Sequence, residues 1–131
     1  MRILLGITGG IAAYKAANLV RALAESGHNV QVLPTKNALE FIGKSTLEAL
    51  SGNPIGTELY EDVQEVRHVK LGQDAELVLV APATANFLAK LANGIADDLL
   101  MNAILASTAP VVVCPAMHTE MWLNPATKAN V

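Results

Sequence analysis

Residues 115–122 read PAMHTEMW and combine a histidine, thioether side chains and the only Trp of the chain. The string follows an apolar run and is expected to leave a strand as a loop. Met117, Met121 and Trp122 are apolar there, so together with His118 they would cover a ligand or pack in a subunit interface. The alternative for Trp122 is ordinary core filling. The string therefore predicts either a ligand cover or an interface at the end of a strand.

A second candidate is the string TGGIAAYK at residues 8–15. The adjacent Gly9 and Gly10 let the backbone approach an anion, and the helix that follows offers free N–H groups at the positive end of its dipole. A phosphate would fit there. The string is neither G-x-G-x-x-G nor a P-loop, so it indicates neither a dinucleotide fingerprint nor a nucleoside triphosphate site. A tight turn from strand to helix explains the glycines equally well.

Two further strings carry hydroxyl and amide groups after strand-like runs. Thr35 in PTKN is either a second phosphate ligand or an ordinary helix N-cap. In APATAN, residues 81–86, the small side chains leave room for a flat ring system, and Asn86 is placed to hydrogen-bond polar atoms of such a ring. The alternative is that Thr84 caps a helix and Asn86 is solvated in its first turn.

His68, in VRHVKLG, is expected in a loop ahead of a strand. It is either a proton acceptor or donor near neutral pH or a solvated surface residue. Cys114 ends an apolar run, which favours a small buried side chain over a nucleophile. The three His and one Cys have no metal-ligand spacing, and the G-x-S-x-G elbow of a hydrolase is missing. The sequence therefore predicts no metal site and no serine hydrolase.

The elements that must position these residues alternate along the chain. Apolar runs predict strands at 2–8, 28–35, 75–84 and 109–116, the last two buried on both faces. Helical patterns occupy 10–27, 35–52 with a break at Gly43, 84–94 capped by Thr84, and 96–107 started by Asp97 or Asp98. Residues 53–73 are expected to be irregular, with a short strand at 57–60. The tail at 123–131 is expected to be a loop.

This alternation predicts an α/β fold, a three-layer Rossmann-like (flavodoxin-like) parallel sheet with helices on both faces and right-handed crossovers. Ligands of such sheets bind beyond the carboxyl ends of the strands. Those ends fall at 6–10, 33–37, 81–86 and 114–122, which contain the candidate residues above. We therefore expect them to share one crevice.

Composition excludes several classes of protein. A chain of 131 residues, 52% hydrophobic and 16% charged with a mean hydropathy of +0.36, suits one folded domain and not a disordered one. The net charge of −3, without a basic run, argues against nucleic-acid binding. Apolar runs shorter than the roughly 20 residues of a membrane helix argue against a membrane span. A single Cys fits a reducing cytoplasm, and the 4% aromatic content fits an Ala-rich subunit that buries surface against its own copies.

Four strings together resemble one family: TGGIAAYK, APATAN, NGIADDLL and above all PAMHTEMW. The chain is similar over nearly all its length to the homo-oligomeric flavin-containing Cys decarboxylases, and most closely to the decarboxylase half of the bifunctional enzymes of coenzyme A biosynthesis. The resemblance implies FMN as cofactor, 4′-phosphopantothenoyl-cysteine as substrate, and 4′-phosphopantetheine with carbon dioxide as products. It also implies a homotrimer that assembles further into a dodecamer.

The resemblance also implies roles for particular residues. The FMN phosphate would bind Gly9, Gly10, Ile11, Ala12 and Thr35. The flavin would be lined by Phe41, Thr84, Asn86 and Ala116. His68 matches the catalytic His of the family, and His118 would act beside it by holding the substrate carboxylate, with Met117, Met121 and Trp122 closing the substrate pocket.

Three departures from the family pattern accompany the resemblance. His118 stands where the family usually has Asn; an imidazole N–H can donate to a carboxylate as an amide does. TGG replaces a frequent Gly-Ser pair. The family's clamp Cys and the ligase half have no match before Val131, so residues 1–131 are expected to be a piece of a longer protein, an FMN-binding decarboxylase domain. The alternatives are a peptidyl-cysteine decarboxylase, a flavin prenyltransferase-like protein or an FMN-binding regulatory subunit.

Overall fold

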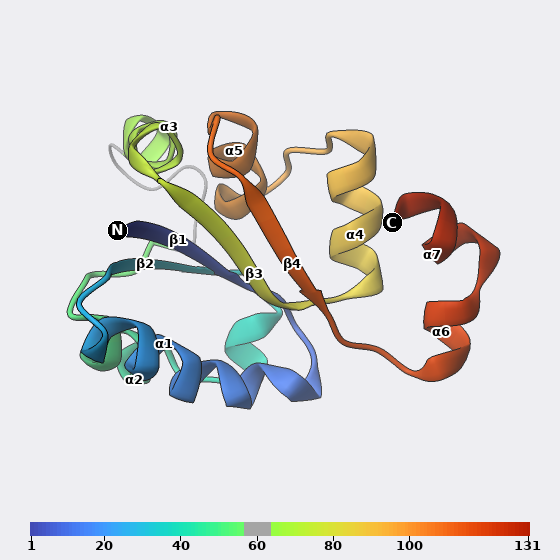
Figure 1. Ribbon diagram of the computed structural model, residues 1–131, viewed down its shortest axis with the longest axis horizontal. Helices are drawn as coiled ribbons and strands as arrows, with labels where there is room; N and C mark the ends of the chain where they lie inside the picture. Colours follow the sequence, from blue (N-terminus) through green and yellow to red (C-terminus); the bar gives the residue numbers. More distant parts are fainter. Residues whose placement is uncertain (57–63) are drawn as a thin grey trace.

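Parallel strands form the centre of the protein in the computed structural model, which describes residues 1–56 and 64–131. The strands are β1 (Arg2–Ile7), β2 (Asn29–Pro34), β3 (Leu77–Ala83) and β4 (Val111–Pro115). They lie in the order β2-β1-β3-β4 (Figure 1). Because the chain leaves β1 toward one edge and later returns to its other side, the carboxyl ends of β1 and β3 form a topological switch point.

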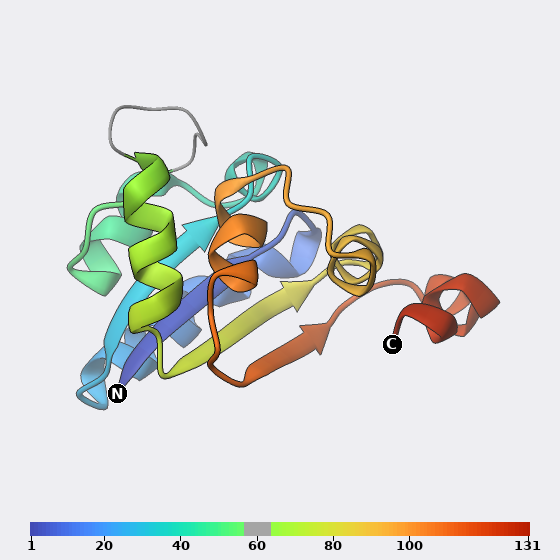
Figure 2. The ribbon, with the colours of Figure 1, turned by 90° about the horizontal axis from the view of Figure 1, so that it is seen from above.

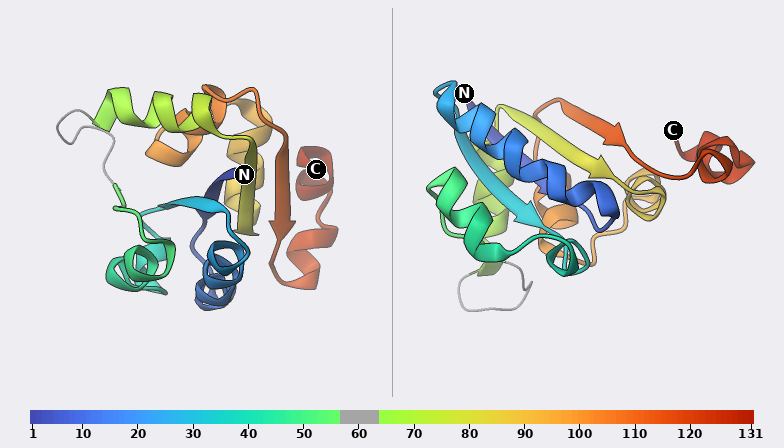
Figure 3. Two further views of the ribbon diagram at one scale, coloured as in Figure 1. Left: turned by 60° about the vertical axis from the view of Figure 1, so that its left-hand side comes forward. Right: turned by 90° about the horizontal axis from the view of Figure 1, so that it is seen from below.

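Helices cover both faces of this sheet. They are η1 (Ile11–Lys15), α1 (Ala16–Glu25), η2 (Ala38–Glu40), α2 (Lys44–Ser51), α3 (Gln64–Asp74), α4 (Ala85–Asn93), α5 (Leu99–Leu105), α6 (Thr119–Leu123) and α7 (Pro125–Asn130). Figure 3 shows α1 and α2 on one face and α3 with α5 on the other. The predicted three-layer parallel α/β architecture is confirmed. Within the described ranges, no helix combines the length and apolar character needed to cross a bilayer.

The core is divided by the sheet into two layers. Alternate residues of β1 point to opposite faces, so Leu4 belongs to the cluster under α4 and α5, whereas Leu5 belongs to the cluster under α1 and α2. Val80 and Leu100 are buried in the same cluster as Leu4, and Val20 is fully buried in the cluster of Leu5. Strands β1 and β3 are therefore held from both sides, which fixes where their carboxyl ends lie.

The helix starts and stops read from the sequence are largely confirmed. The helix predicted at 10–27 begins as η1 and continues as α1, and Gly27 follows it with a positive φ of 90°. The helix predicted at 35–52 is interrupted at Gly43, as expected, and consists of η2 and α2. The side chain of Thr84 caps α4, and of the two Asp residues considered, Asp98 caps α5.

The prediction that residues 53–73 are irregular is wrong for the second half of this segment, which forms α3. The residues of α3 are polar on average, and only a narrow stripe of the helix packs against the core. Leu71, which follows His68 by three positions on the same face, lies in that stripe. His68 is consequently buried, with 5% exposure, and is neither in a loop nor solvated. The strand predicted at 57–60 lies outside the described residues.

The C-terminal segment is also more ordered than predicted. Residues expected to form a loop contain α6 and α7, and α7 packs against α4. Asn124 caps α7 by accepting from the N–H of Ala126, and Pro125 occupies the first helical position. A capping Asn followed by Pro is a helix start signal, and the turn character of these residues obscured it. Figure 2 shows α6 and α7 beyond the end of β4.

Strand β4 is an edge strand, so the prediction that residues 109–116 form a buried strand is wrong in its burial. Val111 and Val112 are 40% and 47% exposed. Cys114 is exposed as well, which contradicts its expected burial. The apolar run has the composition of a strand covered on both sides, but β4 pairs only with β3 among the described strands. The chain therefore presents an apolar edge to its surroundings.

Candidate functional site

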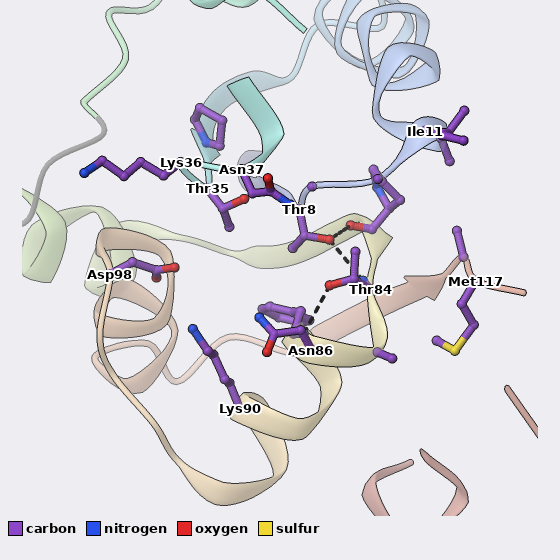
Figure 4. A pocket seen from close by; sticks show the side chains of 18 of the residues that line it. Thr8, Ile11, Thr35, Lys36, Asn37, Thr84, Asn86, Lys90, Asp98 and Met117 are labelled. Carbon is purple, nitrogen blue, oxygen red and sulfur yellow. Dashed lines mark hydrogen bonds between the residues drawn. The ribbon is translucent and has the colours of Figure 1, made fainter. Parts of the chain in front are cut away.

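A large cavity opens at the carboxyl ends of the strands, with a volume of about 1280 Å³. Five segments line it: the turn after β1, the residues between β2 and η2, the Thr84 segment with α4, the connection from α4 into α5, and the loop after β4 (Figure 4). The predicted site residues that meet there are Gly9, Gly10, Ile11, Ala12, Thr35, Thr84, Asn86, Ala116, Met117, His118 and Met121. The expectation that these strand ends share one crevice is confirmed.

Three predicted site residues do not line this cavity. Phe41 follows η2 and is 43% exposed, and Trp122 in α6 is 40% exposed. His68 is buried in α3. The cavity of one chain therefore brings together the Gly9–Gly10 turn proposed for phosphate, Asn86 and His118. His68, the other candidate catalytic residue, is not part of it.

The glycine turn is sandwiched between two neighbouring segments. A Cβ atom built at Gly9 would lie 2.6 Å from Cβ and Cγ of Asn37, which is closer than side chains tolerate. A Cβ atom at Gly10 would lie 3.7 Å from Cγ2 of Thr84, an ordinary contact. Position 9 therefore requires glycine, because the backbone there lies too close to Asn37 on the β2 side of the cavity for a side chain. Gly10 faces Thr84 on the β3 side.

The hydroxyl groups of Thr35 and Thr84 bind backbone at the rim of the cavity. Thr35 Oγ1 accepts from the N–H of Ala38 at 3.1 Å, and Thr84 Oγ1 accepts from the N–H of Phe87 at 3.2 Å. The capping alternative is therefore confirmed for Thr84, whereas the N-cap of η2 is Asn37, so Thr35 bonds the first residue of η2 without being its N-cap. A hydroxyl that accepts through one lone pair keeps its own proton to donate, so these bonds leave each of them able to bind a ligand in the cavity.

Sequence reasoning missed the ionic cluster on the α4–α5 side. Lys90 Nζ lies 2.8 Å from Oδ2 of Asp97, and this hydrogen bond holds the pKa of Asp97 below its usual value. Asp98 Oδ1 accepts from the N–H of Met101 at 2.8 Å, but burial raises the pKa of the Asp98 carboxyl. All three side chains line the cavity. The only sequence signal for the two Asp residues is the run NGIADDLL, which predicts that one of them starts a helix.

The loop after β4 is fixed to the sheet before it enters the cavity. The N–H of Ala116 donates to the carbonyl of Ala83 at 3.1 Å, and the N–H of Trp122 donates to the carbonyl of His118 at 3.0 Å. The first bond anchors the loop to β3, and the second begins α6. The start of the loop is thus tied to β3, and its end at His118 is the N-cap of α6.

Basic side chains are also part of the cavity lining. Lys15 ends η1, and Lys36 lies between β2 and η2; both line the cavity together with Tyr14. Lys90 stands across the cavity, paired with Asp97. The charge of Lys90 is therefore compensated on the α4–α5 side, and Lys15 brings a basic side chain to the cavity at the end of η1.

Comparison with known proteins identifies relatives that match nearly the whole chain. A family model described as Flavoprotein matches residues 1–131. The coenzyme A biosynthesis bifunctional protein CoaBC of Mycolicibacterium smegmatis is 58% identical over 130 residues, which cover 99% of this chain and 31% of that protein. CoaBC of Vibrio cholerae is 48% identical over 132 residues, covering 33% of its length. The chain thus spans about a third of the curated relatives it matches.

Solved structures agree with this comparison. The FMN-dependent cysteine decarboxylase SpaF superposes with a TM-score of 0.90 at 33% identity, covering 99% of this chain and 76% of that one. The C175S mutant of a PPC decarboxylase superposes with a TM-score of 0.86 at 34% identity, covering 98% and 78%.

Proposed function

The chain belongs to the flavoprotein family, and from this premise we propose that its cavity binds FMN and that the protein decarboxylates 4′-phosphopantothenoyl-cysteine in coenzyme A biosynthesis. The observation that carries the proposal is the 58% identity to a coenzyme A biosynthesis bifunctional protein over 130 residues that include every segment of the cavity. The similarity to a PPC decarboxylase structure supports the same reaction.

The residues of the cavity fit FMN. The Gly9–Gly10 turn brings backbone to the cavity where a side chain at Gly9 would collide with Asn37. Lys15, at the end of η1, adds a basic side chain to the cavity lining, which suits a phosphate monoester. A volume of about 1280 Å³ exceeds the several hundred Å³ of common ligand pockets, and leaves room for a ring system and a substrate together.

When bound, FMN supplies reversible two-electron chemistry at the thiol-bearing carbon of the substrate, so that the electrons left by the departing carbon dioxide are delocalised and the product is not oxidised overall. Backbone N–H groups at Gly10 and Ile11 and the hydroxyl of Thr35 would bind the phosphate. The amide of Asn86 would hydrogen-bond the ring. Overall, the bond between the cysteinyl α-carbon and its carboxylate breaks, and a proton takes the place of the carbon dioxide.

His118 would hold the substrate carboxylate. His118 is exposed at the end of the loop after β4 and lines the cavity together with Met117 and Met121. An N–H of the ring would donate to a carboxylate oxygen until the carbon–carbon bond breaks. Met117 and Met121 would limit water access to the reacting carbon.

His68 is retained as the proposed proton acceptor on the strength of the resemblance alone. In the single chain it lies in α3, outside the cavity, so this role requires a route to a cavity that one chain does not provide. A His68→Asn variant that binds FMN but loses turnover would support the role. Unchanged turnover would make His68 a packing residue of α3.

Self-association and location belong to the same proposal. We propose a homotrimer, assembling further into a dodecamer, in the cytoplasm. The exposed apolar side chains of β4 and α6 support the association, because Val111, Val112, Met121, Trp122 and Leu123 are all at least 40% exposed on adjoining elements.

A second substrate class has support of its own. SpaF superposes more closely than the PPC decarboxylase does, with TM-scores of 0.90 and 0.86, and SpaF is described as an FMN-dependent cysteine decarboxylase. The chain also superposes on the peptidyl-cysteine decarboxylase EPID with a TM-score of 0.84 at 26% identity, so a peptide with a C-terminal cysteine is the competing substrate. The test measures carbon dioxide released from carboxyl-labelled 4′-phosphopantothenoyl-cysteine and from such a peptide, with purified protein. Release from the first alone supports the proposal, and release from the peptide alone replaces it.

His118→Ala and His118→Asn variants refine the assay. Loss of the imidazole should lower kcat/KM by about 10- to 1000-fold, since a charge-assisted hydrogen bond is lost, whereas Asn should retain part of the activity because its amide can donate to the same oxygen. Equal activity of His118→Ala and the wild type would remove His118 from the mechanism.

A further inference from the structure

Thr8 is a buried hydroxyl at the end of β1, with 2% exposure. Its Oγ1 donates to the carbonyl of Pro82 at 2.7 Å and accepts from the N–H of Thr84 at 3.0 Å. Its own N–H also donates to the carbonyl of Pro82 at 3.3 Å. One threonine thus joins the ends of two strands that are more than seventy residues apart in sequence.

These bonds lie where the sheet no longer holds the two strands together. The register of β1 against β3 ends at the Gly6–Val80 pair. Beyond it, β1 continues into the glycine turn and β3 into the Thr84 segment, and the hydrogen bonds of Thr8 link the two (Figure 4). The position of the turn relative to the α4 side of the cavity therefore depends on this hydroxyl.

The connection extends into both walls of the cavity. On one side, Gly9 and Gly10 follow Thr8 directly in the chain, and Gly10 approaches the methyl group of Thr84. On the other side, Thr84 caps α4 through its contact with the N–H of Phe87, which sets the direction of the helix that carries Asn86. A shift of Thr84 relative to Thr8 would move Asn86 relative to the glycine turn.

We propose that Thr8 is a positioning residue for the cofactor: its hydroxyl sets the spacing between the phosphate-binding turn and the ring-binding wall at Asn86, and so determines the affinity for FMN. The inference rests on the proposed function, because FMN is the ligand whose two ends the walls would bind. A hydroxyl is required, since it alone donates to Pro82 and accepts from Thr84 in the space of a small side chain.

The test compares the FMN dissociation constants of Thr8→Val, Thr8→Ala and Thr8→Ser with that of the wild type, from quenching of FMN fluorescence at a temperature where circular dichroism shows each variant folded. Thr8→Val keeps the shape but leaves the N–H of Thr84 facing a methyl group. The loss of such a bond corresponds to a weakening of about tenfold or more. Thr8→Ser keeps the hydroxyl and should stay within about threefold of the wild type.

Thr127→Val is the matched control. Thr127 is also a buried threonine, with 8% exposure, but it lies in α7 and does not line the cavity. Its loss should leave the FMN dissociation constant unchanged even where it lowers stability. If Thr8→Val does not fold, the Thr8→Ser and Thr8→Ala pair, which differs only by the hydroxyl, gives the same comparison without adding volume.

The outcomes separate the inference from its premise. Weakened FMN binding in the variants without a hydroxyl, with restoration by Ser, supports the positioning role. If the wild type and all folded variants bind FMN with one affinity, the inference is overturned while the proposed function stands. A wild-type protein that binds no FMN overturns the proposed function, and the role of Thr8 with it.

Discussion

At the scale of single residues, Gly9 shows why the turn after β1 has no side chain on the β2 side. A methyl group there would lie 2.6 Å from two carbon atoms of Asn37. We expect Gly9→Ala to lower the free energy of unfolding by about 1–3 kcal/mol through overpacking, and to weaken FMN binding. Urea denaturation and FMN titration measure the two effects.

Gly10→Ala is the matched control for this prediction. Its added methyl group would make an ordinary 3.7 Å contact with Thr84, and its φ of −165° is open to any residue. Stability should stay within about 0.5 kcal/mol of the wild type. Equal destabilisation by both substitutions would contradict the sandwich between Asn37 and Thr84.

Residue types at strand ends predicted most of the site, because the fold brings such ends together whatever lies between them. Gly9, Thr35, Asn86 and His118 were found in this way. Thr8 was missed: a threonine at a strand end has no sequence signal that distinguishes a buried double hydrogen bond from an exposed hydroxyl. Lys90 was missed because its partner Asp97 lies beyond the end of α4, where helical spacing gives no guide.

At the scale of elements, α3 approaches α5 through Gly72. A Cβ atom at this position would collide with the carbonyl group of Ala103 in α5. Replacing a helical Gly by Ala ordinarily stabilises a protein by up to about 1 kcal/mol, so the direction of the effect is diagnostic. We expect Gly72→Ala to destabilise by about 1–3 kcal/mol in urea denaturation. Stabilisation would show that α3 does not pack as described.

The cap of α5 gives a prediction on pH. Burial, opposed by the hydrogen bond from the N–H of Met101 and assisted by the nearby charge of Asp97, raises the pKa of Asp98 above its usual 3.8. The folded chain therefore holds this proton more tightly than the unfolded chain, so the stability contributed by Asp98 is fully present below that value and is lost as the pH rises through the folded pKa.

Asp98→Asn keeps a capping side chain and removes the ionisation. Relative to the wild type, its stability should increase as the pH is raised above about 4. Asp98→Ala removes the cap and should cost about 1 kcal/mol. Urea denaturation of the three proteins over this pH range measures both effects, and a difference between Asn and Asp that is constant with pH would contradict the role of burial.

Prediction of the elements failed where tertiary contacts override average composition. The segment containing α3 is polar on average, and only its contact with α5 shows why it is helical. For β4 the predicted burial was too high. An apolar run has the same composition whether the strand lies inside a sheet or at an edge that another surface covers. Periodicity reports which residues are apolar, and not what covers them.

At the scale of the whole molecule, the exposed edge at β4 leads to a prediction about assembly. Val112→Glu places a charge on a strand face that is 47% exposed in the single chain. If copies meet there, the substitution should shift sedimentation toward smaller species without changing the circular dichroism. Ala22→Glu, on the exposed side of α1, is the control that should leave assembly unchanged. Identical sedimentation of both variants and the wild type would contradict an interface at β4.

The proposed function requires the crevice at the switch point of the sheet to hold a flavin mononucleotide. The most direct measurement is the visible absorption spectrum of the purified protein, before and after incubation with excess FMN and removal of the unbound fraction. We expect a yellow protein whose flavin content is stoichiometric with the chain. A protein that remains colourless after this treatment, and that leaves the fluorescence of added FMN unquenched, would contradict it.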